Sequence, residues 1–101
     1  MMRPVSPHSL PISVLETCYT LGKLVTASRK ARGLTQLELS ETAGIGCSTL
    51  REIEHGSPKV QFVFWLVVME SLGLLENLTK SASAANMGLI AKAVTQPRSS
   101  S

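Results

Sequence analysis

The sequence predicts an all-α fold of five or six helices in one small domain, and three observations indicate it. The chain has 101 residues, a length that suits a single domain. Apolar residues recur at helical spacing in several segments. Glycines follow these segments at points where helices commonly end, because glycine tolerates a positive φ.

The N-terminal part is predicted to be a flexible arm followed by a first helix. Residues 1–14 contain three prolines and no apolar run long enough for a secretory signal, so we expect an extended arm there. The first helix begins at about Ser13 or Thr17 and runs to Ala31, and Gly33 ends it. The residues expected to form a stripe that faces mostly toward the core are Leu21, Leu24, Val25 and Ser28.

Two short helices joined by a glycine turn are predicted next. Thr35 and Glu38 have the spacing of a capping box, in which the threonine oxygen accepts an amide hydrogen bond and the glutamate reaches back, so a helix starts here. Gly44 ends this helix, and a second one runs from Gly46 to Gly56. Helices this short bury little apolar surface, so the value of the second lies in being presented to a partner.

The two short helices have distinct inner and outer faces. In the first, the expected inward residues are Leu37, Leu39 and Ala43, and the expected water-facing residues are Gln36, Glu38, Ser40 and Glu41. Ile45 is expected to be a buried plug in the turn. In the second, the inward residues are Leu50 and Ile53, and the outward residues are Cys47, Ser48, Arg51 and Glu52.

Residues 60–72 are predicted to form a helix with no polar face. Eight consecutive apolar residues occupy positions 62–69, far short of the roughly 20 that a membrane span needs. Their β-branched and aromatic content leaves a strand as the alternative. Such a helix needs a second surface to cover it. The residues that the core is least able to bury are Phe64, Leu66 and Val67. These three residues are therefore the predicted dimer or partner interface.

The C-terminal part is predicted to hold a short fifth helix over residues 74–78 and an extension over residues 79–101. Within the extension, residues 82–94 have the spacing of a sixth helix, although Gly88 weakens it, and a disordered tail follows. This segment is the alternative cover for the apolar helix within one subunit.

The two short helices resemble the helix-turn-helix of the Xre/Cro family of DNA-binding regulators, the fold of phage repressors. The residues that carry the resemblance are Leu34, Thr35, Gln36, Leu39, Gly44, Ile45, Ser48, Thr49, Leu50, Ile53, Glu54 and Gly56. It extends upstream through Leu21, Gly22, Val25, Arg29 and Gly33, and downstream through Trp65, Val68, Met69, Leu72, Gly73 and Leu74. The resemblance covers roughly residues 15–78 and implies a lambda-repressor-like bundle that serves as a DNA-binding domain.

The resemblance implies that the second short helix lies in the major groove of DNA while the helix before it crosses the backbone. The residues at the family's base-contacting positions are Gly46, Cys47, Ser48 and Arg51. Arg51 is the strongest candidate, because a guanidinium can pair bidentately with guanine; the alternative is a solvated arginine paired with a glutamate. Arg29 and Glu54 resemble a family ion pair that ties the first helix to the end of the reading helix.

Phosphate contacts are expected beside this helix pair. Gln36, at the start of the first short helix, and His55, after the second, fall where the family contacts phosphate. For both residues the alternative is an ordinary exposed polar side chain. The basic residues expected to flank the pair are Lys23, Lys30, Arg32 and Lys59.

Composition limits the other classes of function. The formal net charge is +3, but residues 15–78 contain six basic and seven acidic side chains, so the domain itself carries −1 and a single subunit should bind DNA modestly. The lack of aspartate and of a glycine-rich phosphate loop argues against an enzyme. Cys18 and Cys47 lack CxxC spacing, so we expect no metal, no cofactor and a reduced, cytoplasmic protein.

Together these features predict a sequence-specific transcriptional regulator, a dimeric repressor whose partners are double-stranded DNA and a second copy of the chain. The alternative is the antitoxin of a toxin–antitoxin pair, which binds a partner toxin and represses its own promoter. Both alternatives use the same DNA site, and the antitoxin adds a protein interface. No membrane partner is expected.

Overall fold

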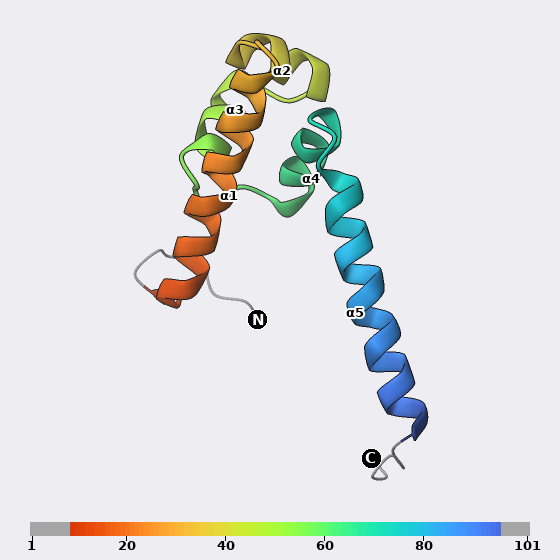
Figure 1. Cartoon of the computed structure of the whole chain (residues 1–101). Helices are drawn as coiled ribbons and strands as arrows, with labels where there is room; N and C mark the ends of the chain where they lie inside the picture. The colour runs from red at the N-terminus through yellow and green to blue at the C-terminus, as the bar shows by residue number, and fades with distance from the viewer. Residues whose placement is uncertain (1–8, 96–101) are drawn as a thin grey trace.

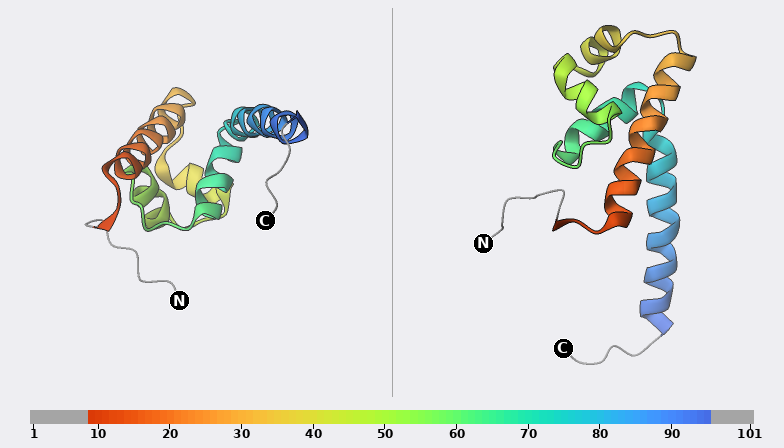
Figure 2. Two further views of the ribbon diagram at one scale, coloured as in Figure 1. Left: turned by 90° about the horizontal axis from the view of Figure 1, so that it is seen from below. Right: turned by 90° about the vertical axis from the view of Figure 1, so that its left-hand side faces the viewer.

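The computed structural model describes residues 9–95, with side chains described for residues 9–89. This part of the chain folds into five helices without a strand (Figures 1 and 2). The helices are α1 (Ile12–Ala31), α2 (Gln36–Ala43), α3 (Cys47–Glu54), α4 (Phe62–Ser71) and α5 (Leu75–Thr95). The predicted all-α class is confirmed, with five helices over the described residues.

α1 starts earlier than predicted and shortens the expected arm. Its N-cap residue is Pro11, whose carbonyl oxygen accepts hydrogen bonds from the amides of Val14 at 3.1 Å and Leu15 at 3.3 Å. Proline is tolerated at a helix start, because an amide there would have no partner within the helix to lose. Residues 12–14 are therefore helical. Residues 1–8 of the predicted arm lie outside the described residues.

α2 begins and ends as predicted. Thr35 Oγ1 accepts a hydrogen bond from the Glu38 amide at 3.1 Å, and Glu38 Oε1 accepts one from the Thr35 amide at 2.8 Å. Gly44 ends the helix with a φ of 72°. Two predicted orientations are wrong: Leu37 is 57% exposed, and Ser40 is buried. The Ser40 hydroxyl donates to the Leu37 carbonyl oxygen at 2.8 Å, so its burial leaves no unmet hydrogen bond.

The core lies between α1, α2, α3 and α4. Its most deeply buried side chains are Val25, Leu39, Leu50, Ile53, Val68 and Leu72. The predicted inward positions of α3, Leu50 and Ile53, are thus confirmed. Ile45 packs half-buried against the same cluster from the turn between α2 and α3. Burial of this kind contributes about 1.5–3 kcal/mol for each large aliphatic side chain, which is how two short helices become stable.

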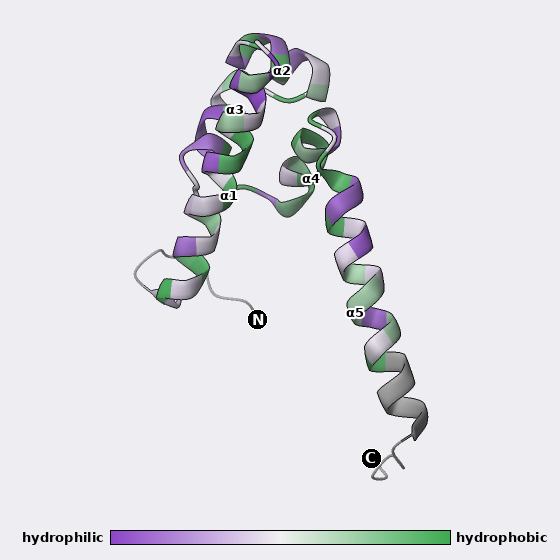
Figure 3. Ribbon diagram, in the orientation of Figure 1, coloured by the Kyte–Doolittle hydropathy of each residue, from purple (hydrophilic) through white to green (hydrophobic). Residues whose placement is uncertain are grey.

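α4 is the predicted apolar helix (Figure 3), and the strand alternative is wrong. Its core-facing residues are Trp65, Val68 and Met69. This stripe sets the rotation of the helix, so the first turn projects from the domain. The exposed fractions there are 70% for Phe62, 53% for Val63 and 36% for Phe64. Among the predicted interface residues, Phe64 is therefore exposed, whereas Leu66 and Val67 are half-buried on the flanks of α4.

α5 joins the two predicted C-terminal helices into one. It follows a turn at Gly73, which has a φ of 74°, and continues through Gly88. A glycine costs a helix only about 1 kcal/mol, too little to end this one. α5 projects away from the other four helices (Figures 1 and 2), and residues 76–89 are all exposed. The alternative in which residues 82–94 cover α4 within one subunit is therefore wrong for the described side chains of residues 82–89.

A helix crosses a membrane only if it is long and apolar enough. Over residues 9–89, no single helix is long and apolar enough to cross a membrane. Phe62–Ser71 and Leu75–Leu89 reach the required length and composition only as a pair, across a bend of 117°.

Candidate nucleic-acid interface

Two glycines bring the backbone of α3 and its following turn against α1. A Cβ atom at Gly22 would lie 2.6 Å from the carbonyl oxygen of Ile53 and 2.8 Å from that of Glu54. A Cβ atom at Gly56, which has a φ of 76°, would lie 2.6 Å from the Cα atom of Tyr19. Only glycine permits approaches this close. The position of α3 on α1 is therefore fixed at two points.

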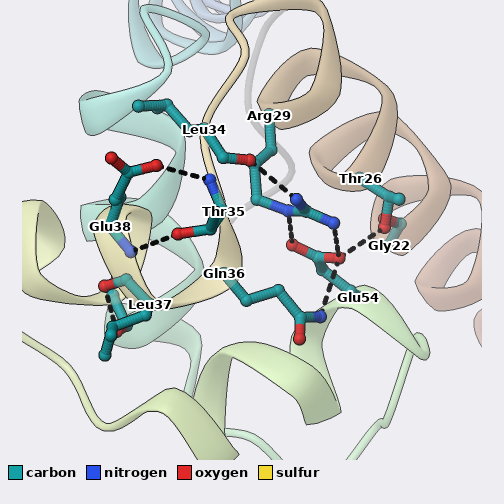
Figure 4. Close-up of polar contacts among 10 residues, drawn as sticks. Gly22, Thr26, Arg29, Leu34, Thr35, Gln36, Leu37, Glu38 and Glu54 are labelled. Atoms are coloured by element: carbon teal, nitrogen blue, oxygen red, sulfur yellow. Dashed lines mark hydrogen bonds and ion pairs between the residues drawn. The ribbon is translucent and has the colours of Figure 1, made fainter.

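The predicted ion pair between Arg29 and Glu54 is confirmed (Figure 4). Arg29 Nε donates to Glu54 Oε2 at 2.7 Å and Arg29 Nη2 donates to Glu54 Oε1 at 3.1 Å, with the two side chains only 11% and 6% exposed. Arg29 Nη1 also donates to the Leu34 carbonyl oxygen at 2.8 Å. Thr26 and Gln36 each donate to Glu54 Oε1, at 3.0 and 3.1 Å. Side chains from α1 and α2 thus meet at one carboxylate at the end of α3.

These contacts keep Glu54 ionised. Burial alone would raise the pKa of this carboxyl. The hydrogen bonds from Arg29, Gln36 and Thr26, together with the charge of Arg29, outweigh burial and lower the pKa below its ordinary value of 4.5. Glu54 therefore remains a carboxylate at neutral pH, and the network that aligns α3 stays intact.

The outward face of α3 carries the predicted base-reading residues. Ser48 and Arg51 are exposed, Cys47 is half-buried, and Gly46 is the N-cap residue, which offers only its backbone. Among the described side chains of residues 9–89 the ion pairs are Arg29–Glu54 and Glu76–Lys80, so the predicted alternative of Arg51 paired with a glutamate is not observed there. The guanidinium of Arg51 is available to an acceptor on another molecule.

A hollow of about 710 Å³ opens between α1 and the ends of α2 and α3. Its lining residues are Tyr19, Lys23, Thr26, Ala27, Arg29 and Lys30 from α1, with Gln36, Glu54 and His55 opposite. It brings together three of the predicted phosphate-positioning residues, Lys30, Gln36 and His55. Tyr19 was not among the site residues predicted from the sequence. Its spacing of four residues from Lys23, which places both on one face of a helix, is the signal that could have found it.

The other predicted phosphate contacts are placed differently. Arg32 does not line the hollow: its Nη2 atom donates to the Leu72 carbonyl oxygen at 2.6 Å, at the C-terminal end of α4, where helix carbonyls lack partners and attract cations. Lys59 is exposed in the loop between α3 and α4.

Gln36, which lines the hollow, donates one amide hydrogen to Glu54, and its second amide hydrogen is left for an external acceptor.

Comparisons of the chain with protein-family models, with curated proteins and with solved structures found no match. The case for a function therefore rests on the residues and geometry of this chain.

Proposed function

We propose that the protein is a sequence-specific DNA-binding regulator that inserts α3 into the major groove. The observation that carries the proposal is the two-sided character of α3. Its inner face is held by Leu50, Ile53 and the Glu54 network, while Ser48 and Arg51 face solvent without a partner in the described part of the chain. A helix fits the major groove, where an arginine can donate two hydrogen bonds to guanine. Cys47, half-buried, and Ser48 are short, so they would read bases at close approach or through water.

The same arrangement supports contacts to phosphate. Gln36 at the start of α2, together with Lys30 and His55, borders one hollow, and Lys59 is exposed beyond α3. Contacts of this kind set the register of a protein on the duplex and carry no sequence information. The function needs no cofactor, metal or catalytic group, and we place it in the cytoplasm.

The regulator acts as a dimeric repressor. Few cations flank α3, so one subunit would bind modestly, and pairing two subunits multiplies the effective affinity. The proposed interface is formed by Phe64 with Leu66 and Val67, on an α4 helix whose first turn is strongly exposed. Two-fold dimers of this class place their reading helices about 34–36 Å apart, one turn of DNA.

Selection of bound sequences from random double-stranded DNA tests the proposal. The expected result is a near-palindrome with half-sites one helical turn apart, or a multiple of that spacing. A parallel selection with Arg51→Ala should lose the preference at one position of each half-site. A protein that enriches no sequence would contradict the proposed function.

A second candidate function is the antitoxin of a toxin–antitoxin pair. The observation that favours it is the amount of apolar surface on α4 and α5. A groove of about 470 Å³ between them is lined by Phe62, Leu66, Leu75, Leu78 and Ala82, among others. A toxin seated there would leave the DNA site free. Co-expression with the product of the neighbouring gene distinguishes the candidates: an antitoxin should co-purify with that product and relieve its toxicity, whereas a simple repressor should do neither.

A further inference from the structure

From the hollow on α1 we infer a binding site for one phosphate group of the DNA backbone. Lys23 and Lys30 supply its positive charge, and Tyr19 positions Lys23. The inference rests on the proposed function and deepens it, because it extends the DNA contact from the α2–α3 pair to the N-terminal half of α1.

The geometry places the hollow beside the reading face. Tyr19, Lys23 and Lys30 follow one another along the same side of α1. His55 lies across the hollow and follows Arg51 by four residues, so it is one helical turn further along the outward side of α3. A duplex whose bases meet Arg51 would therefore bring a flanking stretch of backbone past His55 and toward the α1 stripe.

The net charge of the hollow is positive, whereas the net charge of residues 15–78 as a whole is negative. Lys23, Arg29 and Lys30 line it with Glu54 as its single carboxylate, which gives a net charge of +2 with His55 neutral. Glu54 already accepts four hydrogen bonds from side chains around it. Among the described side chains of residues 9–89, neither lysine has an acidic partner. Two ammonium groups beside a saturated carboxylate attract an anion from another molecule.

Tyr19 holds Lys23 in place at this site. The Nζ atom of Lys23 lies 4.8 Å from the centroid of the Tyr19 ring, a cation–π contact. The backbone of Tyr19 is fixed in turn against Gly56, directly after α3. The contact therefore favours one place for the ammonium group, and that place is defined relative to α3.

The test measures DNA affinity over a series of salt concentrations, with a short random-sequence duplex and the duplex obtained by selection. Lys23→Gln should weaken binding to both duplexes alike, by about eightfold at 0.1 M salt, and should reduce the slope of log affinity against log salt by about 0.9. Lys80→Gln is the control, because Lys80 pairs with Glu76 on α5. Thermal melts of each variant confirm that the fold is retained.

Tyr19 is tested by two substitutions that separate its ring from its hydroxyl. Tyr19→Leu removes the cation–π contact and should weaken both duplexes by about two- to fivefold, with the salt slope unchanged because no charge is lost. Tyr19→Phe keeps the ring and should bind almost as the unmodified protein does.

The outcomes separate the inference from the proposed function. If Lys23→Gln matches the Lys80→Gln control in affinity and slope while Arg51→Ala loses its sequence preference, the α1 site is overturned and the proposed function stands. If the unmodified protein binds neither duplex, the proposed function fails and the inference falls with it.

Discussion

Gly22 determines how closely α1 and α3 can pack. A Cβ atom there would lie 2.6 Å from the Ile53 carbonyl oxygen and 2.8 Å from the Gly56 amide nitrogen, so Gly22→Ala must push the helices apart. We predict a loss of about 1–3 kcal/mol in the free energy of unfolding, measured in urea. Gly88→Ala is the matched control, because no atom lies within 4 Å of its Cβ position. That control should keep the stability or raise it by up to about 1 kcal/mol. Equal stabilities of the two variants would contradict the close contact.

Glu54 links stability to pH. Its pKa in the folded protein is below the ordinary value of 4.5, so the folded state binds fewer protons than the unfolded state in that range. The stabilisation from this carboxylate is fully present above about pH 4.5 and is lost as the pH falls through the lowered value. Glu54→Gln should cost about 3 kcal/mol at neutral pH, because it leaves Arg29 without its counter-charge. Melts from neutral pH to below 4.5 should fall less steeply for this variant; parallel pH profiles would be inconsistent with a native ion pair.

At the scale of a helix, the capping box fixes where α2 begins. Thr35→Ala removes the oxygen that accepts the Glu38 amide hydrogen bond, and it should lower the free energy of unfolding by about 1 kcal/mol. Thr42→Ala is the control, because Thr42 is exposed on the same helix and its hydroxyl bonds only to the Glu38 carbonyl oxygen. The control should change stability by less than about 0.5 kcal/mol. A melt unaffected by the Thr35 substitution would mean that α2 does not depend on this cap.

The elements that could be predicted from the sequence are those fixed by local chemistry. Thr35, Glu38 and Gly44 determine the ends of α2 within a few residues of one another, so their pattern was sufficient. The prediction ended one helix at residue 78 and began the next at residue 82, although residues 79–81, between them, contain no residue that breaks a helix. The contact of Arg32 with Leu72 spans 40 positions. It depends on where the C-terminal ends of α1 and α4 lie in the folded domain, which no short pattern encodes.

At the scale of the whole molecule, the exposed first turn of α4 is the surface available for the proposed dimer. Phe62 is 70% exposed in the same first turn as Phe64 of the proposed interface, so Phe62→Glu should leave the core intact and yield folded monomers with greatly reduced operator affinity. Val67→Glu, at a half-buried position, should have the same effect with some loss of stability. Leu37→Glu, at an exposed position of α2, controls for the added charge and should keep the mass of the dimer. Sedimentation gives these masses, and an unmodified protein that is monomeric at micromolar concentration would rule out a preformed dimer.

The central claim is that α3 reads base sequence, and the most direct measurement is the affinity of Arg51→Ala for the selected duplex and for a random one. Arg51 is exposed and makes no ion pair with the described side chains of residues 9–89, so the substitution should leave the melting temperature unchanged. It should weaken binding to the selected duplex by about 1–3 kcal/mol, roughly 5-fold to 160-fold, while binding to the random duplex changes little. Equal losses on both duplexes, or no loss on either, would contradict base reading by α3.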